Sequence, residues 1–110
     1  MAAVRTATVT WTGDLASGEG TVSAGSGVFA DLPVSWPART GDASGPTSPE
    51  ELLAAAHAAC YAMSLAGELA AKGSVPDHVD VRAVVTLDQV EDGSHRIVAS
   101  ELLARARVTG

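Results

Sequence analysis

The chain has 110 residues, a length typical of a single domain with a modest hydrophobic core. Apolar residues make up 46% of it, so it is expected to fold, and its formal net charge of −6 argues against nucleic acids and anionic membranes as partners. One cysteine allows no internal disulfide and fits a reducing cytoplasm, and the N-terminal residues lack the apolar core of a signal peptide.

The N-terminal part of the chain predicts a β-hairpin. Residues 4–11 alternate with period two and are rich in β-forming side chains, which is typical of a strand. Glycines and polar residues between positions 13 and 18 mark a turn. Residues 20–29 are the expected partner strand, although two glycines interrupt them.

A short strand and a loop are expected next. Residues 34–36 lie between two prolines and are expected to form a third strand. Residues 38–47 are rich in Gly, Ser, Asp and Pro, so they are expected to form a loop, which carries Arg39.

The strongest prediction is a long helix over residues 49–72. Ser48 and Glu51 have the spacing of a capping box, and a proline at the first helical position costs no hydrogen bond. Gly73 is a natural left-handed stop. Because residues 52–67 carry no formal charge, the helix is expected to be covered on all sides or to span a membrane.

Two environments fit such an apolar helix. A membrane span is disfavoured, because the uncharged run is shorter than the ~20 residues that a span needs. The run also contains His57 and Ser64. We expect instead a central helix that is covered by a sheet on one side and by a second copy of itself on the other.

The C-terminal part predicts a second hairpin. Residues 79–90 alternate as a strand does, and Asp92-Gly93 is a hairpin signal within the turn at residues 91–94. Residues 95–108 fit a helix by composition, but they follow a hairpin turn and show a period-two apolar face, so we expect a strand. The fold is therefore expected to be α+β, with an antiparallel sheet wrapped on one long central helix.

Cys60 is the first candidate for chemistry. Buried cysteines are commonly inert, and Cys60 lies too far along the helix for the N-terminal dipole to favour its thiolate. A reactive thiolate there needs a cation from elsewhere. Arg39 is the obvious source of that cation, and Glu50 is a group that could orient Arg39. Two ordinary interpretations fit as well: Arg39 as a solvated loop arginine, and Glu50 as a common first-turn glutamate.

The spacing of Glu50 and Cys60 restricts how they can cooperate. Ten residues separate them, so on one straight helix they lie about 15 Å apart along the axis and about 80° apart around it. Either the helix is broken between them, or two copies pack antiparallel so that Glu50 of one nears Cys60 of the other. We favour the second arrangement.

His57 and Cys60 share a helix face at i, i+3 spacing. This spacing suits two metal ligands or a Cys–His catalytic pair. Neither is favoured, because no further Cys or His stands at ligand spacing and no third, orienting group is evident. No metal site is expected.

Residues 47–63, TSPEELLAAAHAACYAM, closely resemble the central motif of the OsmC/Ohr peroxidases, the osmotically inducible protein C and organic hydroperoxide resistance family. Residues 11–14 and 18–23, and the position of Arg39, resemble the OsmC branch of this family. The resemblance implies an intertwined homodimer with the two central helices at its heart.

The same resemblance implies a cytoplasmic, thiol-dependent peroxidase of the oxidative and osmotic stress response. Its expected substrates are organic hydroperoxides, and the resemblance does not decide whether hydrogen peroxide is a substrate as well. By resemblance Cys60 is the peroxidatic cysteine, Arg39 binds the thiolate and the peroxide, and Glu50 holds Arg39. No metal or organic cofactor is implied.

The chain departs from the family pattern at its C-terminus. Family members continue through a helix with a second cysteine and a last strand, so residues 1–110 are expected to be a single OsmC-like domain that is truncated there. Turnover would then need an external thiol or dithiol reductant. The alternative is a non-catalytic relic or binding module that keeps the fold without turnover.

Overall fold

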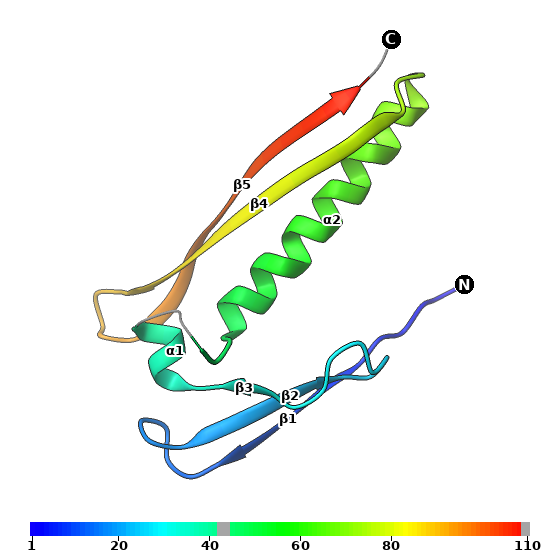
Figure 1. Cartoon of the computed structure of the whole chain (residues 1–110). Helices are drawn as coiled ribbons and strands as arrows, with labels where there is room; N and C mark the ends of the chain where they lie inside the picture. The colour runs from blue at the N-terminus through cyan, green and yellow to red at the C-terminus, as the bar shows by residue number, and fades with distance from the viewer. Residues whose placement is uncertain (42–44, 109–110) are drawn as a thin grey trace. The chain divides into compact units, whose positions relative to one another are not determined.

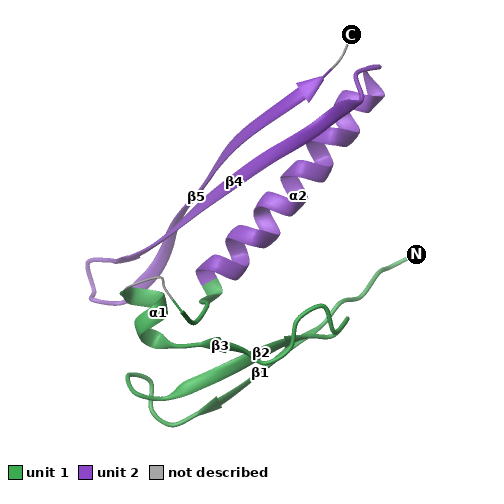
Figure 2. Cartoon of the chain, viewed as in Figure 1, with its two compact units in different colours: residues 1–49 green, residues 50–110 purple. Residues whose placement is uncertain are grey.

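A computed structural model describes residues 1–41 and 45–108. The chain divides into two compact units, Met1–Pro49 and Glu50–Gly110 (Figure 2). The elements along the chain are β1 (Ala7–Thr12), β2 (Glu19–Ala24), β3 (Leu32–Val34), α1 (Trp36–Thr40), α2 (Pro49–Ala71), β4 (Pro76–Gln89) and β5 (His95–Val108) (Figure 1).

Unit 1 is built on a three-stranded antiparallel sheet in the order β1-β2-β3. Trp11 of β1 pairs with Gly20 of β2, and a Cβ at Gly20 would lie 2.6 Å from the Trp11 ring. The indole therefore covers this glycine and leaves no room for a side chain. The hairpin prediction is confirmed, but β2 ends at Ala24, where a turn through Gly27 at φ 81° interrupts the expected longer strand.

The short helix α1 corrects two predictions. The third strand ends at Val34 rather than at residue 36, and Arg39 lies in a helix rather than in a loop. The helix forms because the Ser35 hydroxyl accepts a hydrogen bond from the backbone N–H of Ala38 at 3.1 Å and because Pro37 stands in the first turn. Residues 42–44 of the expected loop lie outside the described residues.

The segment that follows α1 is fixed to β3 again before the long helix begins. Thr47 forms a parallel bridge with Val34, and its N–H donates to the carbonyl of Pro33 at 2.7 Å. The backbone is thus fixed on both sides of α1.

In unit 2, α2 runs unbroken from Pro49 to Ala71. Gly73, two residues past the end of α2, has the left-handed conformation that was predicted, with φ 85°, and the N–H of Ser74 donates to the Leu69 carbonyl at 2.9 Å. Lys72 follows the helix instead of lying in its last turn. The capping box stays a prediction.

The strands β4 and β5 form a long antiparallel hairpin whose turn has Gly93 at φ 84°. The prediction of β5 is confirmed residue for residue, whereas β4 begins three residues earlier than expected. Ser100 pairs with Val85, and it is hydrogen-bonded to His57 of α2. Hence the alternating valine face of β4 is the one turned toward α2. Figure 1 shows α2 running beside the β4–β5 hairpin.

The expected α+β class is confirmed, with antiparallel strands before and after one long helix. Among the described residues the strands form two sheets, one in each unit. Val22, at 4% exposure, is the buried apolar side chain of the described part of the chain.

Candidate active site

Cys60 is a free thiol, and it is exposed. It lies two residues from the half-buried Ala58 and Ala62, and therefore about 160° around the axis of α2 from each. The thiol thus points away from the half-buried side of the helix. In the single chain it is not the buried, inert cysteine that its apolar surroundings in the sequence suggest.

The helix face around Cys60 is apolar and open. Leu53 is 42% exposed and Met63 is 71% exposed, and both lie within about 60° of Cys60 around the helix axis. Exposed apolar side chains that lie together on one face are typical of a surface that binds a partner.

Glu50 stands in the first turn of α2, and only 7% of it is exposed. The unbroken helix excludes the alternative in which a break brings Glu50 to Cys60. Their axial separation is therefore the ~15 Å of ten helical residues, so one chain does not bring these two side chains together.

Arg39 is held within unit 1 by its own helix. Its guanidinium carbon lies 5.8 Å from the centroid of the Trp36 ring, within the range of a cation–π contact. The side chain is half-buried, and α1 is fixed to the end of β3. Arg39 belongs to unit 1 and Cys60 to unit 2.

His57 has a partner that the sequence did not reveal. Its Nδ1 and the Ser100 hydroxyl oxygen are joined by a hydrogen bond of 2.6 Å that spans 43 residues of chain. No local signal marks Ser100, because its relation to His57 depends on which face of β5 meets α2. Among residues 1–41 and 45–108, no group of three or more His, Cys, Asp or Glu side chains could hold a metal ion.

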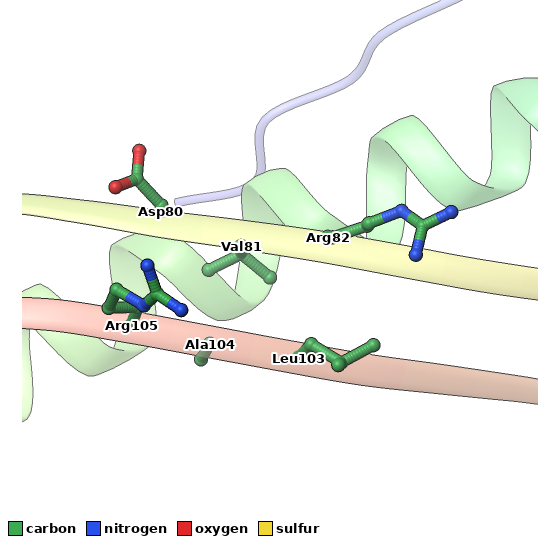
Figure 3. A pocket seen from close by; sticks show the side chains of 6 residues that line it. All are labelled: Asp80, Val81, Arg82, Leu103, Ala104 and Arg105. Carbon is green, nitrogen blue, oxygen red and sulfur yellow. The ribbon is translucent and has the colours of Figure 1, made fainter.

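The opposite face of the β4–β5 hairpin is charged. In Figure 3 a hollow there is lined by the cross-strand pairs Asp80–Arg105 and Arg82–Leu103, with Val81 and Ala104 between the two pairs. These six residues include no Cys, Ser, Thr, His or Lys, so the candidate thiol chemistry stays on α2.

By length and composition α2 is able to cross a membrane. This is weak support for a membrane location, because core helices of water-soluble proteins share these properties.

Residues 40–109 match the family described as OsmC-like protein. The peroxiredoxin OsmC of Escherichia coli K12 is 45% identical over 83 residues, which are 76% of this chain and 57% of that protein. The chain therefore spans little more than half the length of this relative.

Two solved structures share the fold. The organic hydroperoxide resistance protein OhrB of Bacillus subtilis has a TM-score of 0.68 and 29% identity, covering 92% of this chain and 71% of that one. An OsmC-like protein of unknown function from Vibrio cholerae has a TM-score of 0.73 and 18% identity, with 99% and 77% coverage.

Proposed function

Since the chain belongs to the OsmC-like protein family, we propose that it is a thiol peroxidase that reduces organic hydroperoxides through Cys60. The observation that carries the proposal is an exposed free thiol within the matched segment. A relative that is 45% identical is named a peroxiredoxin, which supports the same chemistry. Arg39 lies one residue before the matched segment, so its role rests on the resemblance alone.

The proposed reaction is a two-electron oxidation of the thiol. The Cys60 thiolate attacks the distal peroxide oxygen, so that an S–O bond forms while the O–O bond breaks. The alkoxide leaves and takes up a proton to become an alcohol, and the cysteine becomes a sulfenic acid. Arg39 stabilises the thiolate and the charge that develops on oxygen, and Glu50 holds Arg39. The chemistry requires no metal or organic cofactor.

We propose that the active unit is a homodimer in which two α2 helices pack antiparallel. Two observations support this arrangement: the ~15 Å between Glu50 and Cys60 on one unbroken helix, and the exposed apolar face that carries Leu53 and Met63. In such a pair Glu50 of one chain serves Cys60 of the other, and the apolar faces cover each other.

The oxidised thiol has to be reduced from outside these residues. They contain one cysteine, so the sulfenic acid has no second thiol among them with which to form a disulfide. An external thiol or dithiol is the proposed reductant, and a reducing cytoplasm the proposed compartment.

Residues 1–110 are proposed to act as a single domain, which predicts coincident urea transitions by tryptophan fluorescence and circular dichroism.

Hydroperoxide consumption tests the proposal against the alternative of a non-catalytic relic or binding module. The wild-type chain is incubated with cumene hydroperoxide and a dithiol, in parallel with Cys60→Ser and with the control Ser64→Ala, one turn further along the same helix. We expect the wild type and the control to consume peroxide while Cys60→Ser does not. Equal background rates for wild type and Cys60→Ser would end the enzyme proposal. One turnover followed by arrest as sulfenic or sulfinic acid would locate the defect in reduction of the thiol.

A further inference from the structure

The hydrogen bond between His57 and Ser100 lies one helical turn from Cys60. It joins α2 to β5 at a heavy-atom distance of 2.6 Å, and Ser100 is the cross-strand partner of Val85. His57 itself is half-buried. The bond is therefore a long-range polar link between the helix that bears the thiol and the hairpin beside it.

The apolar packing of α2 provides little else to fix its rotation. Its half-buried positions other than His57 are alanines and leucines, namely Leu52, Ala54, Ala58, Ala62, Leu65, Ala66 and Leu69. Helices fix their mutual orientation by fitting ridges of side chains into grooves, and alanine methyl groups make only low ridges. Between Leu52 and Leu65 the half-buried positions other than His57 are all alanines. A hydrogen bond is directional, so it selects one rotation among several that this alanine-lined middle of the helix tolerates.

We propose that His57 is a positioning residue, whose bond to Ser100 sets the rotation of α2 on the β4–β5 hairpin and thereby the direction of the Cys60 thiol. The inference rests on the proposed function, in which Cys60 must meet a peroxide oxygen in line. His57 contacts neither substrate nor thiol in this role. It acts through the helix that it holds.

Small rotations of α2 would have large effects on the thiol. With side chains included, an α-helix has a radius of about 5–6 Å, so a rotation of about 20° moves a side-chain tip by about 2 Å. A displacement of about 1 Å at a reacting atom can cost about 100-fold in rate. We therefore expect loss of the bond to slow peroxide oxidation of Cys60 by about 10- to 100-fold, with the thiol still present and the chain still folded.

Two substitutions at position 57 separate positioning from simple packing. The side-chain amide of His57→Asn stands where Nδ1 stands and can keep the bond to Ser100, whereas the amide of His57→Gln stands nearer Nε2 and cannot. Single-turnover oxidation by cumene hydroperoxide, with the sulfenic acid trapped by dimedone, is measured for both variants, for Ser100→Ala and for the double variants. We expect His57→Asn to stay within about threefold of wild type, and His57→Gln and Ser100→Ala to be slow to the same extent.

The double variants decide whether the bond itself is responsible. His57→Gln combined with Ser100→Ala should be no slower than either single variant, because both remove the same bond. A wild-type rate for Ser100→Ala, or rate losses that multiply in the double variant, would overturn the inference.

A second measurement follows the rotation without the reaction. Because Cys60 is the single cysteine of the chain, nitroxide labels at Cys60 and at Arg82→Cys report the distance between helix and hairpin by pulsed electron resonance in chains diluted with unlabelled protein. We expect Ser100→Ala to broaden or shift this distance distribution, and an unchanged distribution overturns the inference. If wild-type Cys60 is not oxidised while the distribution responds to Ser100→Ala, the proposed function fails and the positioning of α2 stands.

Discussion

Met63 offers the sharpest test of the proposed helix pair. It leaves 71% of its surface exposed on the same side of α2 as Cys60. Fully burying such a side chain is worth about 1.5–3 kcal/mol, so covering its exposed part gives about 1–2 kcal/mol per chain, or about 2–4 kcal/mol for a symmetric dimer. Met63→Lys removes this contribution and adds the cost of desolvating an ammonium group. Since 1.4 kcal/mol is tenfold in Kd, the Kd for dimer dissociation should rise by at least about 30-fold, so the dimer becomes weaker.

Sedimentation velocity over a dilution series from micromolar to nanomolar concentration measures this Kd. The matched control is Leu15→Lys in the β1–β2 turn, where a leucine that is 60% exposed lies outside α2. The control should dimerise as the wild type does. A wild-type chain that is monomeric throughout, or a Met63→Lys dimer with the wild-type Kd, would refute the reasoning.

Three further predictions follow from single residues. Gly20→Ala places a methyl group 2.6 Å from the Trp11 ring, so it should destabilise the chain by about 1–3 kcal/mol in urea unfolding and change the tryptophan emission, whereas unchanged stability would contradict the packing. Hydrogen bonds from Ser94 lower the pKa of Asp92 from its ordinary value. The ionised carboxylate therefore stabilises the folded chain at pH values above the unfolded-state pKa, and this contribution is lost as pH falls through the lower folded-state pKa. Titration of Asp92 by NMR should therefore show an upward shift in Ser94→Ala, and an unshifted curve would count against these bonds. Arg39→Ala should slow Cys60 oxidation about 100-fold in a chain that still folds, while a wild-type rate would remove Arg39 from the mechanism.

Much of the fold could be predicted because its signals are local. The bounds of β5 follow from a hairpin turn and a period-two pattern, and the C-terminal end of α2 follows from Gly73, at φ 85°. The helix α1 does not follow from the sequence, although its signals are local too. It is five residues long, and its capping by Ser35 and the proline in its first turn were outweighed by the neighbouring glycines and prolines.

The candidate site was only partly predictable, since its parts depend on long-range geometry. The exposure of Cys60 depends on which face of α2 meets the hairpin, which the almost uniformly apolar helix sequence does not indicate. Ser100 is 43 residues from His57, and only the register of β4 and β5 brings it to the helix. The separation of Glu50 and Cys60 was predictable, because helical rise depends on residue count alone.

Complementation in trans tests the central claim most directly. Cys60→Ser and Glu50→Gln chains are prepared separately, unfolded, mixed in equal amounts and refolded, and their hydroperoxide consumption is compared with that of each parent. If Glu50 serves the partner's thiol, each mixed dimer contains one complete site, and the mixture should recover about a quarter of the wild-type rate from inactive parents. A mixture that stays as inactive as its parents, although mixed dimers are shown to form, would contradict a site built from two chains.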